Sequence, residues 1–230
     1  HQAMLICIPN VLTQEQVQFC REQLAQAEWV DGKVTTGAQS ATVKANQQVE
    51  QNSPIAKQLG EMITRTLSNL PRFIAAALPS KIFPPLFNCY RDGGYFGIHT
   101  DNSIMTAPHS YLRLRTDLSA TLFLCEPDTY SGGELTIETT YGAQEVKLNA
   151  GDMVLYPSTS LHQVKPVTQG ERICAFFWLQ SMVRDEGERS LLYDLDQSIQ
   201  TLAAVHGIGH AEVLRLSGIY HNLIRRWADI

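Results

Sequence analysis

The sequence of 230 residues has no long uninterrupted apolar segment and no cluster of basic residues. A helix needs roughly 20 consecutive apolar residues to span a bilayer, so a membrane protein is not expected. The 18 Lys and Arg residues are scattered and the formal net charge is -5, whereas a nucleic-acid-binding protein carries a basic stripe. We therefore expect neither membrane nor nucleic acid as a partner.

The sequence also has no C-x-x-C pair, and its five cysteines are odd in number and widely spaced. This pattern argues against a disulfide framework. No basic segment followed by an apolar stretch marks the chain for export. His1–Ala3 precede Met4, which we expect to be the natural initiator. The prediction is a cytoplasmic protein with reduced thiols.

With 44% hydrophobic and 18% charged residues, the chain is expected to form one large domain, or one domain with a small appendage. A short strand at residues 4–8 precedes a helix from Gln14 to about residue 27, for which Thr13 is a suitable N-cap. A second helix is expected from Pro54 to about residue 70. Residues 31–51 are polar and weakly patterned, so they are predicted to form a loop or irregular hairpin near the surface.

Eight short runs rich in β-forming residues follow, separated by Gly, Pro, Asp and Asn. The runs are Pro85–Arg91, Tyr95–His99, Leu118–Cys125, Glu134–Thr139, Gln144–Leu148, Met153–Tyr156, His162–Val164 and Arg172–Gln180. Because no long helical pattern falls between them, they favour a jelly roll or barrel over βαβ units.

Helical periodicity returns after Arg184, in two stretches that Gly207 and Gly209 separate. A helical hairpin of roughly 40 residues is too small for a core of its own, so it must pack on the β domain or on a partner subunit. We predict a mainly β chain with flanking helices (α+β). Its parts are an N-terminal helical support region (4–82), a β core (83–182) and a C-terminal helical extension (185–230), through which a homodimer could form.

His99 and Asp101 lie two residues apart, so on a strand both side chains share one face and can meet one ion. Alone this pattern is weak, because one His-x-Asp is expected by chance in roughly a third of such sequences. His162 follows a loop rich in Pro, Ser and Thr. Two histidines and one carboxylate are the donor set of the non-haem iron(II) facial triad. A structural zinc site would normally have four ligands, usually including cysteine.

Arg172 lies ten residues after His162, at the start of an apolar strand. A lone arginine there is costly to bury unless it pairs with an anion. Its guanidinium can bind a carboxylate through two parallel hydrogen bonds. Arg172 is therefore a candidate for binding a dicarboxylic co-substrate, and the alternative is a salt bridge at the strand edge.

His99-x-Asp101, His162 and Arg172, in this order among β strands, resemble the motif of the Fe(II)/2-oxoglutarate-dependent dioxygenases. Within that group the chain is most similar to the prolyl-4-hydroxylase-like branch and its PKHD-type hydroxylases. The resemblance covers residues 84–180 closely and the flanking helices more loosely. It implies a double-stranded β-helix, which is a jelly roll with iron at one open end.

The resemblance also implies the roles of individual residues. His99, Asp101 and His162 look like the Fe(II) ligands, Arg172 like the anchor of 2-oxoglutarate, and Tyr90 like a further contact of that co-substrate. The implied reaction uses O2 and releases succinate and CO2, with L-ascorbate as a reductant. Related halogenases lack the carboxylate ligand, so the presence of Asp101 implies hydroxylation.

The substrate is not identified by the sequence. The resemblance allows a protein side chain or a small molecule, and residues 31–51 and 103–117 are expected to set the choice. Ser119 or Thr121, on the following strand, is expected to line the same pocket. Two alternatives stay open: a cupin-like metal-dependent isomerase or hydrolase that does not use 2-oxoglutarate, and a non-catalytic jelly-roll binding module.

Overall fold

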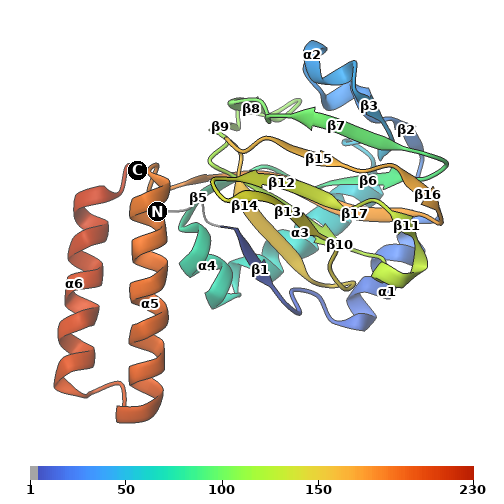
Figure 1. The fold of residues 1–230 in the computed structure, drawn as a ribbon. Helices are drawn as coiled ribbons and strands as arrows, with labels where there is room; N and C mark the ends of the chain where they lie inside the picture. Colours follow the sequence, from blue (N-terminus) through green and yellow to red (C-terminus); the bar gives the residue numbers. More distant parts are fainter. Residues whose placement is uncertain (1–4) are drawn as a thin grey trace.

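The computed structural model describes residues 5–230, apart from the side chain of residue 35 (Figure 1). The expectations for residues 1–4, including Met4 as the initiator, lie outside this range. Two antiparallel sheets form the body of the molecule, and their order differs from the order of the strands in the chain. This arrangement is the predicted double-stranded β-helix with flanking helices.

The larger sheet has eight strands. In spatial order they are β1 (Ile6–Ile8), β14 (Met153–Pro157), β10 (Leu118–Phe123), β17 (Arg172–Ser181), β6 (Leu86–Tyr90), β4 (Gln47–Val49) and β2 (Trp29–Asp31), with β5 (Pro79–Ile82) paired to β17. Nearly every residue of the central strands β6, β10, β14 and β17 is buried. Continuous burial explains why these strands appear in the sequence as apolar runs and not as an alternating pattern.

The smaller sheet has five strands. They are β13 (Gly142–Val146), β12 (Leu135–Thr139), β15 (His162–Val164), β7 (Tyr95–His99) and β3 (Lys44–Ala45). Two short ribbons add β8 (Ile104–Thr106) with β9 (Arg113–Arg115), and β11 (Ser131–Gly132) with β16 (Val167–Gln169). Apolar side chains of both large sheets join one core, for example Ile137 from β12 and Phe177 from β17.

Helices of the N-terminal region complete this core. They are α1 (Gln14–Leu24), α3 (Pro54–Ser68) and α4 (Pro71–Ala77). Two 3-10 turns lie elsewhere in the chain, at Gly32–Thr35 and at Pro127–Thr129. Thr13 caps α1 as predicted, because its side chain accepts a hydrogen bond from the Gln16 amide at 3.1 Å. Ser53 caps α3 in the same way, ahead of Pro54. Burial of Leu59 and Ile63 then fixes α3 against the core.

The prediction of a loop or irregular hairpin for residues 31–51 was wrong in part. This segment contains the short helix α2 (Ala38–Ala41) and two strands, of which β4 pairs with β6 and β3 pairs with β7. The strands have only two or three residues and bear polar side chains such as Lys44 and Gln48. A strand this short shows no apolar alternation, so its pairing depends on contacts that are distant in sequence.

The C-terminal hairpin consists of α5 (Glu186–His206) and α6 (Ala211–Trp227), and it projects from the β body (Figure 1). A small cluster of apolar residues joins its base to the body, with Leu78 and Val183 on one side and Leu192 on the other. The hairpin therefore packs on the β domain, which was one of the two alternatives expected from the sequence. Among residues 5–230, no helix combines the length and apolar character needed to cross a membrane.

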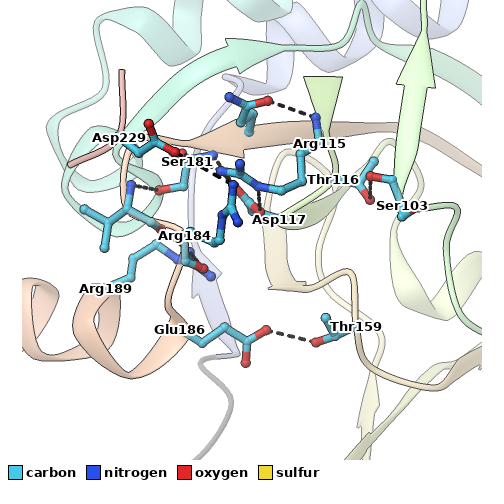
Figure 2. Close-up of polar contacts among 12 residues, drawn as sticks. Ser103, Arg115, Thr116, Asp117, Thr159, Ser181, Arg184, Glu186, Arg189 and Asp229 are labelled. Atoms are coloured by element: carbon cyan, nitrogen blue, oxygen red, sulfur yellow. Dashed lines mark hydrogen bonds and ion pairs between the residues drawn. The ribbon is translucent and has the colours of Figure 1, made fainter. Parts of the chain in front are cut away.

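Polar contacts reinforce the base of the hairpin (Figure 2). Arg189 on α5 is buried, and its Nη1 donates to the Val183 carbonyl at 2.7 Å. Arg184 lies 3.8 Å from the carboxylate of Asp229, beyond the end of α6. Thr159 donates to Glu186 at 2.9 Å across the junction. The start of α5 is thus held to both the segment that connects it to β17 and the loop before β15.

Candidate metal and co-substrate site

His99 and His162 lie opposite each other on the adjacent strands β7 and β15. Residues directly opposite on antiparallel strands share one face, and the two imidazole centroids are 4.2 Å apart. Asp101 follows two residues after His99, and its Oδ1 is 3.4 Å from the Nε2 atom of each histidine. The three predicted ligands therefore converge, with their candidate ligand atoms within 4.8 Å of one another.

Each histidine is held by a hydrogen bond to a backbone carbonyl. The Nδ1 atom of His99 lies 2.7 Å from the Gly97 carbonyl oxygen, and that of His162 lies 2.9 Å from the Ser160 carbonyl oxygen. A carbonyl oxygen can only accept, so Nδ1 donates in both residues and the Nε2 lone pair is directed at the shared site. Phe96 also stacks on His99, with centroids 3.6 Å apart.

Asp101 is oriented by donors to its second oxygen. Oδ2 accepts hydrogen bonds from Ser119 Oγ at 2.6 Å and from Trp178 Nε1 at 3.0 Å. Ser119 Oγ is also 2.7 Å from Ser158 Oγ, so the hydroxyl belongs to a short chain. With Oδ2 occupied, Oδ1 is the oxygen that faces the two histidines.

The electrostatics of the triad keep Asp101 ionised, as a carboxylate metal ligand has to be. Burial by itself raises the pKa of Asp101, but the charge of His162 and hydrogen bonds from His162, His99 and Ser119 outweigh it and hold this pKa well below its usual range. Burial lowers the pKa of His162, whereas the Asp101 carboxylate raises it, and the net shift is upward. An ionised carboxylate with two imidazole nitrogens is a donor set suited to iron(II), and three ligands leave positions open for other groups.

Arg172 begins β17 and lies opposite Tyr90 of β6. Its side chain is 1% exposed, and the guanidinium lies 5.2 Å from the Tyr90 ring centroid and 5.3 Å from that of Phe123. Within residues 5–230, no carboxylate forms an ion pair with Arg172, and its Nε has no hydrogen-bond partner. A strand-edge salt bridge therefore does not explain this arginine, and a buried cation of this kind calls for an anion from outside the chain.

One cavity joins the triad to this arginine. All five predicted site residues line it, and so do Ser119 and Thr121, as expected from the sequence. Residues 31–51 contribute to its wall, whereas none of the lining residues comes from residues 103–117. Of the two segments expected to determine substrate choice, residues 31–51 therefore lie at the cavity and residues 103–117 do not.

Sequence reasoning missed three lining residues that the geometry makes important, namely Lys44, Tyr156 and Trp178. Trp178 could have been found, because it lies six residues after Arg172 on the same strand and so shares its face. Tyr156 lies opposite Ser119 on the neighbouring strand, which follows only from the register of β10 and β14. Lys44 has no signal in the sequence, since its strand was not predicted.

Two family models match the chain. Residues 85–180 match the 2OG-Fe(II) oxygenase superfamily, and residues 186–229 match the PKHD-type hydroxylase C-terminal domain. Among curated relatives, a PKHD-type hydroxylase of Methylobacillus flagellatus is 58% identical over 226 residues, which are 98% of this chain and 100% of that protein. A PKHD-type hydroxylase of Burkholderia cenocepacia is 56% identical with the same coverage.

Solved structures show the same fold at low sequence identity. A prolyl-4-hydroxylase of Pseudomonas putida has a TM-score of 0.54 and 19% identity, covering 78% of this chain and 93% of that chain. HygX of Streptomyces hygroscopicus, solved with nickel and 2-oxoglutarate bound, has a TM-score of 0.53 and 13% identity, covering 79% and 84%. These likenesses concern the architecture of the two sheets.

Proposed function

Because this chain belongs to the PKHD-type hydroxylases of the 2OG-Fe(II) oxygenase superfamily, we propose that His99, Asp101 and His162 are the ligands of its catalytic iron. The enzyme is an Fe(II)- and 2-oxoglutarate-dependent dioxygenase. The observation that carries the ligand assignment is the convergence of the two Nε2 atoms on Asp101 Oδ1. The carbonyl contacts of both Nδ1 atoms support it, because they leave each Nε2 free to bind a metal.

Arg172 is proposed to bind the distal carboxylate of 2-oxoglutarate. Its buried guanidinium has no acidic partner among residues 5–230, and a carboxylate matches its paired N–H donors. Tyr90, opposite Arg172 on β6, is proposed to contact the same co-substrate. Iron, when bound, supplies the activation of O2 that is coupled to conversion of 2-oxoglutarate into succinate and CO2. The residues of the chain orient the reactants and shield them from water.

The reaction on the substrate is proposed to be hydroxylation, since Asp101 retains the carboxylate that related halogenases lack. The substrate is a protein side chain or a small molecule. Solved structures of similar fold include both types: a prolyl hydroxylase with a peptide fragment from Trichoplax adhaerens, and HygX with hygromycin B. Family membership removes the support for a cupin-like enzyme that does not use 2-oxoglutarate and for a non-catalytic binding module.

Further parts of the proposal concern the enzyme's surroundings. L-ascorbate is proposed as the reductant that keeps iron in the Fe(II) state, and the cytoplasm as the location. The five cysteines are free in the structure, and four of them are buried, which agrees with a reducing compartment. We also propose the division into a support region (4–82), a catalytic core (83–182) and a helical extension (185–230), the last as the contact of a homodimer.

The test measures iron content and succinate release from 2-oxoglutarate in the absence of substrate. His99→Ala and His162→Ala should each abolish stoichiometric iron binding and succinate release, because removing one imidazole leaves two ligands. His221→Ala is the matched control, since His221 is exposed on α6, and it should behave like the parent enzyme. Retention of normal iron affinity by both His99→Ala and His162→Ala would refute the ligand assignment.

A further inference from the structure

Lys44 lies in the wall of the catalytic cavity without an assigned role. It belongs to β3, which pairs with β7 so that Lys44 lies opposite Phe96. The residue is only 5% exposed, and it lines the same cavity as the His99, Asp101 and His162 triad. Lysine is almost never this buried unless its charge is paired.

The known partners of Lys44 do not neutralise its charge. Nζ donates to Thr36 Oγ1 at 2.7 Å and lies 4.8 Å from the centroid of the Phe96 ring. Both partners are uncharged, and no ion pair of Lys44 occurs within residues 5–230. A buried ammonium with only a hydroxyl and a ring beside it is costly to keep.

Two carboxylates act on Lys44 from a distance, and both have other partners. Asp31 accepts from the Lys33 amide at 2.9 Å, and Asp101 Oδ2 is occupied by Ser119 and Trp178. Burial lowers the pKa of Lys44 to about 8, while the charges of Asp101 and Asp31 oppose this shift. Lys44 thus lines the cavity without an ion-pair partner among residues 5–230.

The site proposed for 2-oxoglutarate does not include Lys44. The proposed site of its distal carboxylate is Arg172 on β17 of the larger sheet, and its 2-oxo acid end belongs at the triad. Lys44 lies on β3 of the smaller sheet. In that sheet the strands β15 and β7, which carry the two histidines, lie between β12 and β3. The cavity thus contains a second cation beyond the one that the co-substrate needs.

The surroundings of Lys44 are polar. Thr36, Gly37 and Ser40 line the cavity on the same segment, and Asn102 lines it from the segment after β7. Gly37 lies close to Asn102, because a Cβ atom on Gly37 would be 3.1 Å from Asn102 Oδ1. The two segments therefore meet at the cavity and contribute hydroxyl and amide groups to its wall.

We propose that Lys44 binds a carboxylate group of the hydroxylated substrate, which makes the substrate class a carboxylic acid. This inference rests on the proposed function of the cavity. A single ammonium balances one negative charge, whereas a phosphate dianion would require further cations. Substrate binding completes an ion pair that the resting enzyme lacks.

The experiment measures thermal stability of the enzyme loaded with Mn(II) and saturating 2-oxoglutarate. The probes are a panel of amino acids and other small carboxylic acids, each compared with its own primary carboxamide. In the parent enzyme, at least one acid should raise Tm by roughly 3–6 °C at about ten times its Kd. Its carboxamide should give no comparable shift.

Two variants of Lys44 separate its charge from its packing. Lys44→Met keeps a long side chain on Phe96 and should lose the shift caused by the acid, whereas Lys44→Arg should keep part of it. Lys33→Met is the matched control, because Lys33 is exposed in the adjacent turn, and it should retain the full shift. The proposal is overturned if acids and carboxamides shift the parent enzyme equally, or if the shift persists in Lys44→Met. Failure of the proposed function would look different, since 2-oxoglutarate with Mn(II) would then not raise Tm at all.

Discussion

Trp178 is expected to tune the metal site through Asp101 without contacting the metal. Its indole Nε1 donates to Asp101 Oδ2 at 3.0 Å, and the ring packs edge-on to Phe83. Trp178→Phe removes the donor and retains an aromatic ring, so the fold should survive. Loss of such an outer hydrogen bond typically lowers metal affinity by roughly 10–100-fold.

A titration of the apoprotein with Fe(II) or Mn(II) measures the effect of Trp178→Phe. Trp227→Phe is the control, because Trp227 packs in the cluster at the base of the hairpin and away from the cavity. Unchanged metal affinity in Trp178→Phe, with an unchanged circular dichroism spectrum, would show that Ser119 alone orients Asp101.

Arg172→Ala should separate binding of the co-substrate from binding of the metal. The guanidinium has no acidic partner within residues 5–230, so its removal unpairs no carboxylate there. We expect KM for 2-oxoglutarate to rise at least roughly 30-fold, the equivalent of about 2 kcal/mol. Iron content should stay close to that of the parent enzyme.

Steady-state succinate release at varied 2-oxoglutarate tests this expectation for Arg172→Ala. Arg113→Ala, which removes an exposed arginine of β9, should leave KM unchanged. Arg172→Lys should lie between the two, because lysine keeps the charge and loses the paired donors. A normal KM in Arg172→Ala would place the co-substrate elsewhere.

The residues that sequence reasoning could find were those whose chemistry conflicts with their surroundings. Arg172 entering an apolar strand is conspicuous in the sequence itself, whereas His99-x-Asp101 gains weight only together with His162 and Arg172. Lys44 and Tyr156 are not conspicuous, because a lysine in a polar segment and a tyrosine in a strand are ordinary. Only the register of β3 on β7 and of β10 on β14 brings them to the cavity.

The junction between β9 and β10 is held to the end of β17 by Asp117. Its carboxylate accepts from Arg115 Nε at 2.7 Å, from Arg115 Nη2 at 2.9 Å and from the Ser181 amide at 2.8 Å (Figure 2). Asp117→Asn keeps the shape and removes the charge. Since hydrogen bonds to charged groups contribute about 1.5–3 kcal/mol, the variant should lose about 2 kcal/mol of unfolding free energy.

Urea unfolding measures this loss through the midpoint and slope of the transition. Glu171→Gln is the matched control, because Glu171 pairs with Arg91 and both side chains are about half exposed. Exposed pairs contribute at most about 1 kcal/mol, so this control should change little. Equal effects of the two substitutions would contradict the role given to Asp117.

Among the elements, the apolar pattern decided what could be predicted from the sequence. The long central strands and the capped helices α1 and α3 have apolar patterns strong enough to show their type. β3, with two residues, and β4, with three, have none, and they form only because β7 and β6 offer them free edges. The segment of the cavity wall that carries Lys44 is therefore among the parts of the fold that the sequence did not predict.

In the whole molecule, the C-terminal hairpin leaves apolar side chains uncovered. Val205 and Ile208, at the tip, are 72% and 82% exposed, and Leu214 and Ile219 on α6 are also exposed. Single exposed apolar residues are ordinary, but several on one projecting element mark an interaction surface. The homodimer proposed for this extension would cover these side chains with the same element of a second copy, as in a closed symmetric dimer.

Light scattering during size-exclusion chromatography should therefore report a dimer of the full chain. The double variant Leu214→Glu and Ile219→Glu should convert it to a monomer that still binds iron, because these side chains lie outside the cavity. Tyr141→Glu is the control, since Tyr141 is 77% exposed at the turn between β12 and β13 and should leave the dimer intact. A parent enzyme that is monomeric at micromolar concentration would rule the dimer out. A dimer that survives the double variant would instead show that its contact lies on another face.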